Sequence, residues 1–158
     1  MKYELEDLLR VRNLRKDRAS DALIKAQNAL AEAKKFCEQQ KIKLEMFVKK
    51  KPDFIRQIYD KLFKKPQFKR NYMDLIAFKL GKLNEHQSKL AIALQKAQNL
   101  EEEAAKKVEQ CKAALKQATV EMNKIEEHKV TWKAEVSALE QVEQDKELED
   151  FKTKSSKE

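Results

Sequence analysis

Apolar residues recur at alternating steps of four and three residues through most of the second half of the chain. Polar residues interrupt the series only at Gln87, Glu101 and Lys129. A seven-residue repeat kept in register over this length exceeds that of an ordinary globular helix, and its period of about 3.5 residues implies a left-handed supercoil. A long helix with one narrow seam is therefore predicted. The seam positions of this second arm are Ile76, Leu80, Leu83, Gln87, Leu90, Leu94, Ala97, Glu101, Ala104, Val108, Cys111, Leu115, Ala118, Met122, Ile125, Lys129, Trp132, Val136 and Leu139.

The first part of the chain carries the same spacing, with alanine at several positions where leucine is usual. Small residues allow two helices to approach closely, so the two arms are predicted to pack against each other. Arg12 and Lys16 weaken the seam near its start, where the arm either frays or meets another partner. The seam positions of this first arm are Leu9, Arg12, Lys16, Ala19, Leu23, Ala26, Leu30, Ala33, Cys37, Gln40, Leu44 and Phe47.

Two prolines lie between the arms. Proline disfavours helical geometry in the residue before it and clashes with the preceding turn, so the first helix is predicted to stop at Pro52, with a second break at Pro66. The apolar residues between the prolines fall on one face of a short amphipathic helix. They are Phe54, Ile55, Ile58, Leu62 and Phe63.

The predicted fold is all-α, a long antiparallel two-helix coiled-coil hairpin with a short helical segment at the tip. One domain is expected over residues 1–152, with a first arm at about 3–50, a tip at about 51–69 and a second arm at about 70–150. Residues 153–158 are expected to form a disordered tail.

Composition excludes most other classes of protein. The 158 residues include one glycine and two prolines, too few for the turns of a sheet, and 39% of them are charged. No stretch approaches the roughly 18 apolar residues that span a bilayer, and the start lacks the apolar core of a signal peptide. We therefore expect a cytoplasmic protein.

Residues for catalysis or metal binding are not grouped in any known pattern. His86 and His128 are isolated on helical faces, and there is no glycine-rich phosphate loop and no Ser/His/Asp grouping. Cys37 and Cys111 form no CxxC and have no histidine at metal-ligand spacing, so both are expected to be reduced. No enzymatic activity, cofactor or metal is predicted.

Positive charge is concentrated at the tip. Residues 49–70 carry a formal charge of +7 in a chain whose net charge is +8, and aromatic residues gather in the same region. Such a tip suits an acidic protein, a membrane surface or nucleic acid, or its aromatics form a small core that lysines solvate. Nucleic acid is not predicted, because only Arg56 and Arg70 offer forked guanidinium groups and no binding motif accompanies them. The candidate protein-binding residues of the tip are Lys49, Lys50, Lys51, Phe54, Arg56, Tyr59, Phe63, Lys64, Lys65, Lys69 and Arg70.

The two arms are expected to differ in length. If the chain reverses near residues 60–66, Leu5 lies opposite residues near 120–125 and the second arm overshoots the first. Trp132, Val136 and Leu139 would then form an apolar stripe with no partner inside the chain. Such a stripe indicates contact with another protein or with a second copy of this chain. The acidic residues beyond it are expected to fray into a solvated tail.

Arginine is concentrated near the start of the chain, where Arg10, Arg12, Arg15 and Arg18 are four of its six arginines. The planar, multi-donor arginine head suits specific pairing with carboxylates, which suggests an acidic partner surface. Pairing along the same helix and with acidic residues of the second arm is the alternative interpretation.

The opening of the chain resembles that of the YscO/FliJ family, the stalk proteins of type III secretion and flagellar export. The rest of the chain resembles the family in its size, its long charged helices, its hairpin turn and its lack of glycine. The two prolines make the tip more elaborate than a bare helical turn. The resemblance is carried by Leu5-Glu6-Asp7-Leu8-Leu9-Arg10-Val11-Arg12 with Arg15, Arg18 and Ala19.

This resemblance implies a cytoplasmic stalk, similar to the γ subunit of rotary ATPases, at the inner-membrane secretion apparatus. The end that bears the four arginines, Trp132, Val136 and Leu139 would contact the secretion ATPase hexamer, and the tip would face the export gate protein. Family members are also implicated in handling export chaperones. Proximity of the tip to the membrane surface stays open. The alternative function is a structural coiled-coil scaffold or a chaperone-like clamp outside secretion.

Overall fold

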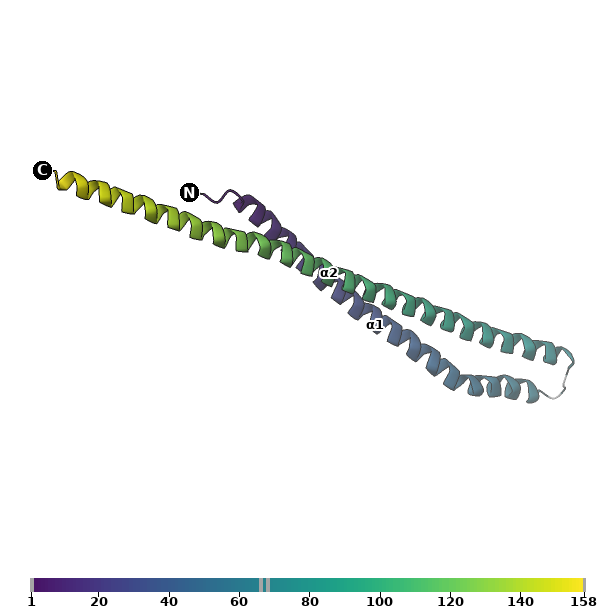
Figure 1. Cartoon of the computed structure of the whole chain (residues 1–158). Coiled ribbons are helices and arrows are strands. Elements are labelled where there is room, and N and C mark those ends of the chain that lie inside the picture. The colour runs from purple at the N-terminus through teal and green to yellow at the C-terminus, as the bar shows by residue number, and fades with distance from the viewer. Residues whose placement is uncertain (1, 66, 68, 158) are drawn as a thin grey trace. The chain divides into compact units, whose positions relative to one another are not determined.

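Two long helices account for nearly all of the chain. The computed structural model describes residues 2–65, 67 and 69–157, with α1 at Glu6–Phe63 and α2 at Asn71–Ser155 (Figure 1). Acidic residues occupy the first turn of each helix and lysines the last, where they complement the positive and negative ends of the helix dipole. The described residues contain no strand. The predicted all-α, two-helix fold is confirmed.

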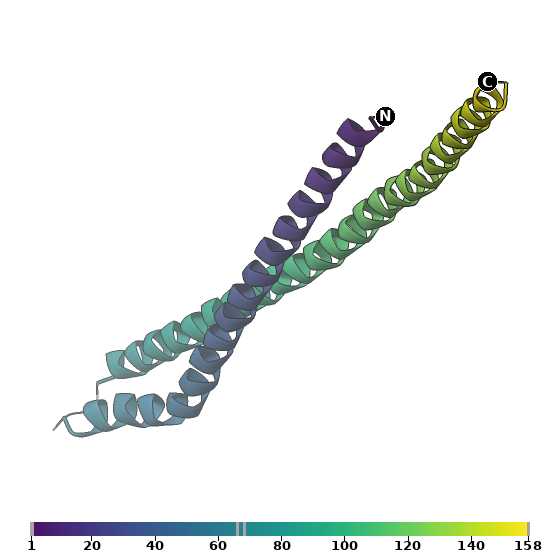
Figure 2. The same cartoon turned by 90° about the vertical axis from the view of Figure 1, so that its left-hand side faces the viewer.

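The chain divides into two compact units, and each contains a part of both helices. Unit 1 is Met1–Ile24 with Gln110–Glu158, and unit 2 is Lys25–Glu109. Within unit 1, Glu6 pairs with Lys129 at 2.6 Å and Arg12 pairs with Glu121. The partner number falls as the α1 number rises, so the two helices run antiparallel in this unit (Figure 2).

Unit 2 has the same antiparallel arrangement and contains the reversal of the chain. The Phe47 ring meets His86 edge-on, with ring centroids 4.7 Å apart, and Lys51 Nζ donates a hydrogen bond to Asn84 Oδ1 at 2.7 Å. After Phe63 the last turn closes through a bond from Lys64 N to Asp60 O. The first turn of α2 begins with a bond from Tyr72 N to Lys69 O. Pro66, the expected second break, lies outside the described residues.

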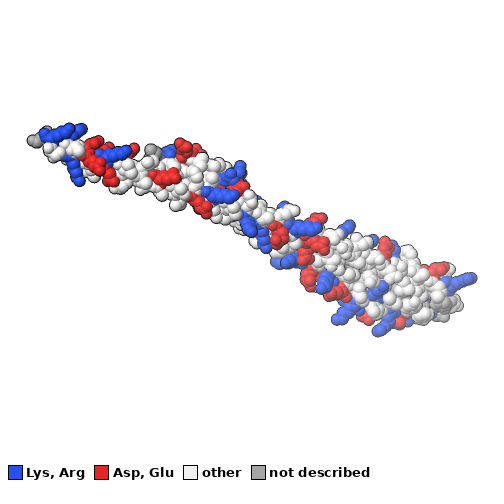
Figure 3. Space-filling view, viewed as in Figure 1, with Lys and Arg blue, Asp and Glu red and all other residues white. Residues whose placement is uncertain are grey.

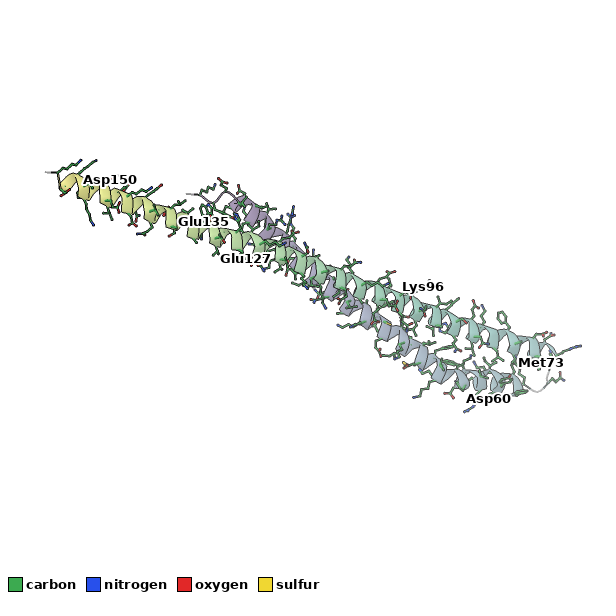
Figure 4. All side chains as sticks on the ribbon, viewed as in Figure 1. Asp60, Met73, Lys96, Glu127, Glu135 and Asp150 are labelled. Atoms are coloured by element: carbon green, nitrogen blue, oxygen red, sulfur yellow. The ribbon has the colours of Figure 1, made fainter. Side chains whose placement is uncertain are left out.

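The predicted heptad seam is the shielded stripe of both helices. Every seam position of the first arm is buried or half-buried, and so is every position of the second arm except Leu139. The small Ala97 and Ala26 are among the most buried residues, at 1% and 4% exposed, as expected where two helix backbones approach closely. The other faces are solvated; Lys96 on α2 and Asp60 on α1, for example, are exposed and project outward in Figure 4.

Pro52 does not end the first helix. α1 continues through it to Phe63, so the prediction of a break at residues 49–52 and of a separate tip helix is wrong. The segment between the prolines is helical and amphipathic, as expected, but it is the last part of α1. Pro52 is exposed, so the carbonyl of Val48 that loses its hydrogen bond is left on a solvated side of the helix. Figure 1 shows α1 bending in its last third, which is the usual response to an internal proline.

The seam itself changes register at Pro52. The shielded positions after Phe47 are Lys51, Ile55, Ile58 and Leu62. The steps from 47 to 51 and from 51 to 55 are both four residues, whereas a heptad repeat would follow a step of four with a step of three. Such an insertion of four residues locally unwinds a coiled coil. Lys51 occupies the altered position, and its Nζ is held by Asn84 and by Gln87 Oε1, both at 2.7 Å. The bend and the change of register therefore coincide.

The Pro52→Ala variant is expected to be more stable than the natural chain. Alanine restores the backbone donor and removes the ring clash, whose joint cost in a helix interior is about 3 kcal/mol. Urea unfolding followed by far-ultraviolet circular dichroism should show a higher midpoint, whereas the neighbouring exposed substitution Asp53→Ala should change it little. A lower midpoint for Pro52→Ala would contradict this and show that the bend is needed to keep the seam in register.

The C-terminal region is helical further than predicted. α2 extends to Ser155, so the acidic stretch does not fray and residues 153–155 are not a disordered tail. Lys152 and Lys154 in the last turn oppose the exposed carbonyls and favour the helical end.

Candidate protein-binding surfaces

The residues before α1 fasten its start to α2 within unit 1. Tyr3 is 5% exposed, and its Oη forms a hydrogen bond with His128 Nδ1 at 2.6 Å. Its ring lies against Trp132, with centroids 5.0 Å apart and planes inclined by 53°. Lys129 Nζ lies 5.9 Å from the centre of the same ring and pairs with Glu6. We call Tyr3, His128 and Trp132 the aromatic clasp.

The aromatic clasp corrects the expected register of the two arms. The expectation that Trp132 lies beyond the first arm without a partner is wrong, because Tyr3 covers it. Leu5 is flanked by Tyr3 and Glu6, whose partners lie at residues 128–132, so it lies opposite that region and not opposite residues 120–125. α1 ends at Phe63 and α2 begins at Asn71, so the chain reverses between these two residues and not as early as residue 60. Tyr3 precedes the helical repeat, so periodicity does not identify it.

Arg12 is used inside the hairpin. Its Nη1 pairs with Glu121 Oε2, and both side chains are about one-third exposed or less, at 26% and 33%. A hydrogen bond from Gln117 Nε2 at 3.3 Å and the nearby Arg12 lower the pKa of Glu121 below its usual range, against the opposing effect of desolvation. The pair is therefore charged at neutral pH. This ion pair with Glu121 explains how Arg12 occupies a seam position.

The other three arginines of the first arm are exposed. Arg10 makes a surface pair with Asp7 at 3.2 Å, where both side chains are more than two-thirds exposed. Arg15 and Arg18 are exposed on the same helix. Exposed pairs of this kind add little stability. These three side chains can reach an external acidic surface without disturbing the hairpin, whereas Arg12 cannot.

The last part of α2 has no helix beside it among the described residues of unit 1. Val136 is half-buried, and all residues from Ser137 to Lys157 are exposed; we call residues 137–157 the overhang. Figures 1 and 2 show this end of α2 continuing alone, and Figure 4 labels Asp150 on it. The overhang carries large apolar side chains among acidic ones. Those most exposed are Leu139 (59%), Val142 (48%), Leu148 (59%) and Phe151 (73%).

Exposed basic and exposed apolar side chains both lie on the surface of unit 2 near the reversal of the chain. Of the predicted tip residues, Lys51 points into the seam and Tyr59 is half-buried, with its ring stacked on Phe63 at 5.9 Å. The rest are exposed. Three exposed apolar residues near the helix ends, Phe63, Met73 and Phe78, complete this surface. We call these three residues with Lys61, Lys64, Lys65, Lys69, Arg70 and Lys82 the tip surface.

A shallow apolar depression lies further along unit 2. The rings of Phe47 and Phe54 are 6.2 Å apart, and His86 meets Phe47 from α2. Lysines stand at its edge. The depression is lined by Lys43, Met46, Phe47, Lys50, Phe54, His86 and Leu90. The sequence identifies His86 only as an isolated helical residue, because its neighbours depend on the pairing across the hairpin.

The described residues offer little reactive chemistry. Cys37 and Cys111 are half-buried free thiols, and partial burial with a hydrogen bond to Glu101 raises the pKa of Cys37. No three His, Cys, Asp or Glu side chains in the described part of the chain lie close enough to hold a metal ion. Within the same part, neither helix has a stretch apolar enough to cross a bilayer.

Comparison with known families identifies a family to which the chain is similar along most of its length. The model of a family described as type III secretion protein YscO matches residues 5–154, which include nearly all of α1 and α2. No curated protein and no solved structure matches the chain.

Proposed function

Because the chain belongs to the YscO family of type III secretion proteins, we propose that it is the cytoplasmic stalk component that couples the secretion ATPase ring to the export gate. Membership in the family makes the chain a component of type III secretion. The proposed coupling of the ATPase ring to the export gate is argued from the surfaces that the two helices leave exposed. The observation that carries it most directly is the overhang, a helix with exposed apolar side chains and no second helix beside it among the described residues.

The overhang is proposed as the contact with the secretion ATPase. Apolar side chains such as Leu139 and Phe151 gain free energy when a partner covers them, and an unpaired helical stripe is a common form of protein contact. Arg10, Arg15 and Arg18 in the same unit offer guanidinium groups to acidic residues of the ring. Val136 lies at the start of this contact. Trp132 and Arg12 support it indirectly, because they hold the start of α1 against α2.

The proposed action on the ATPase is mechanical, with no catalytic step assigned to this chain. A protein that contacts a ring of subunits changes their activity only if it binds one conformation of the ring more tightly than another. The overhang carries both apolar and charged residues, so each subunit around it would contact a different set of side chains and bind it with a different free energy. The overhang would thus bias the ring toward the conformations in which it fits.

The tip is proposed to face the export gate. Lys49, Lys50 and Arg56 are exposed, and the apolar depression beside them has lysines at its edge. An amphipathic helix with acidic residues at its polar edge would fit such a depression. Export chaperones are further candidate partners of the same exposed residues.

The proposal is tested by binding to the ATPase of the same secretion system. The purified chain should be retained by the immobilised, folded hexamer and should change its rate of ATP hydrolysis. A chain that ends at residue 136 should fold into the same hairpin and lose retention. If the full chain does not bind a functional hexamer, the ATPase contact is wrong, although membership in the family stands.

A further inference from the structure

We propose that the tip surface binds anionic lipid, so that this end of the hairpin lies on the membrane. The ligand is a bilayer whose headgroups bear negatively charged phosphates. The inference rests on the charge and exposure of the tip surface, and it does not depend on the proposed ATPase contact.

The first argument is unpaired positive charge. Residues 49–70 contain seven lysines and two arginines against two aspartates. Among the residues that the structure describes, Lys61, Lys64, Lys65, Lys69 and Arg70 are all exposed, and none forms an ion pair. Several basic residues gathered at one place attract anionic headgroups, since each adds to the attraction near the surface.

The second argument is apolar surface within the same region. Phe63 at the end of α1 and Phe78 near the start of α2 are each 62% exposed, and Met73 is 58% exposed. Lysines accompany the aromatic rings, with Lys82 Nζ 5.4 Å from the centre of the Phe78 ring and Lys65 Nζ 5.1 Å from that of Tyr72. Rings that enter the headgroup layer beside lysines that stay at its surface are typical of interfacial binding. Figure 3 shows blue basic side chains projecting from a largely white surface at this end of unit 2.

The composition of the tip surface favours lipid over an acidic protein or nucleic acid. Lysine is a compact point charge, whereas specific pairing with carboxylates and base edges is better served by arginine, which is the minor basic residue here. A peptide partner needs a groove, and Phe63, Met73 and Phe78 are not among the residues that line the apolar depression. Exposed rings and lysines at the two helix ends and in the residues between them instead suit a flat, deformable interface.

Flotation with lipid vesicles tests the proposal. The full chain should float with phosphatidylcholine vesicles that contain roughly a third of phosphatidylglycerol, and should not float with phosphatidylcholine alone. The triple variant Lys64→Glu, Lys65→Glu and Lys69→Glu should bind at least roughly a hundredfold more weakly, because each basic residue near an anionic surface contributes about a fivefold factor. The control variant Lys34→Glu, Lys35→Glu and Lys106→Glu changes the net charge equally at exposed positions of the same unit, and it should bind as the natural chain does.

A second variant separates lipid binding from general attraction to anions. Phe63→Ser with Phe78→Ser leaves the charge unchanged, and it should lower vesicle binding about tenfold at physiological salt if the rings enter the interface. Far-ultraviolet circular dichroism should show unchanged helicity, because both rings are exposed.

Three results would overturn the proposal: no binding to anionic vesicles, equal loss in the control variant, or full vesicle binding by the Phe63→Ser, Phe78→Ser variant. Binding to heparin or transfer RNA with the affinity seen for anionic vesicles would instead identify a general polyanion site and also contradict it. The ATPase retention of the same variants is measured in parallel. Because none of the changed residues lies in the overhang, loss of lipid binding with retained ATPase binding distinguishes this inference from the proposed function.

Discussion

Replacing Leu139 and Val142 by aspartate is expected to abolish binding to the secretion ATPase without unfolding the hairpin. The two side chains are 59% and 48% exposed on the overhang, so the change costs little in the free chain. In the complex it would place two charges in an apolar contact. A hot-spot side chain at the centre of an interface costs about 2 kcal/mol or more when it is lost, so losing two should lower affinity by roughly a thousandfold.

A matched control is available on the same helix. Ile92 and Leu100 are 55% and 54% exposed on the part of α2 that belongs to unit 2. Ile92→Asp with Leu100→Asp adds the same charge and removes the same type of side chain, and it should leave ATPase binding unchanged. The two affinities are compared by sedimentation with the hexamer. Equal effects of both double variants would mean that the overhang is not the contact.

Substitutions at Leu139 and Val142 test the ATPase contact more directly than substitutions at Trp132 or Arg12. Trp132→Ala would remove the ring that covers Tyr3, and reversal of Arg12 would place like charges beside Glu121. Both would loosen the start of α1. Any loss of binding could then come from altered folding of unit 1, whereas the side chains of Leu139 and Val142 are largely in solvent in the free chain.

Reversing the charge of the tip is expected to stop secretion while ATPase binding persists. The variant is Lys49→Glu, Lys50→Glu, Lys64→Glu and Lys65→Glu, which changes the formal charge of residues 49–70 from +7 to −1. A surface built to attract acidic partners or anionic lipid would then repel them. Secretion of any exported substrate should fall by at least about tenfold, because four charged groups change sign at once.

Lys51 is left unchanged in this variant for a structural reason. Its Nζ donates hydrogen bonds to Asn84 and Gln87 of the opposite helix, so a glutamate there would remove both bonds beside the bend of α1. The control variant reverses Lys34, Lys35, Lys106 and Lys107, which are exposed in unit 2, and should secrete normally. Secretion is measured by complementation of a deletion strain, and ATPase binding by retention on the hexamer. A parallel loss of both activities would show that the two surfaces are not separate.

The regular part of the fold could be predicted from the sequence because a two-helix layer depends mainly on one repeating property. Each seam position needs shielding, and the repeat of seven records this directly. Even polar seam residues such as Arg12, Gln40 and Glu101 are shielded at the predicted places. The resemblance of the first residues to the YscO/FliJ family is likewise confirmed by the match over residues 5–154.

Two of the misplaced features, the early end of the first helix and the separate tip helix, follow from one local effect at Pro52. A proline in a helix interior costs about 3 kcal/mol, which the shielding of Ile55, Ile58 and Leu62 on the continued helix can offset. Rules based on local sequence include the cost of proline in a helix, but they do not include the free energy gained when the following apolar residues pack against the other helix. The reversal falls between Phe63 and Asn71, and in the resulting register Trp132 has Tyr3 as a partner. Partners separated by more than a hundred residues cannot be assigned before the register is known.

The candidate binding residues stay a prediction, but the structure divides them by accessibility. Arg12, Lys51 and Trp132 are engaged within the hairpin, whereas Arg15, Leu139, Lys64 and the other exposed members can meet a partner directly. Periodicity alone could not make this distinction, because it identifies a face of a helix and not what covers that face.

Site-specific photo-crosslinking from position 139 in secreting cells tests the central claim most directly. A photoreactive phenylalanine analogue in place of Leu139 is expected to capture the secretion ATPase, because that side chain lies exposed on the overhang. The same analogue in place of Ile92 should not capture it. Crosslinks from position 139 that join only copies of this chain, or that never contain the ATPase, would contradict the account.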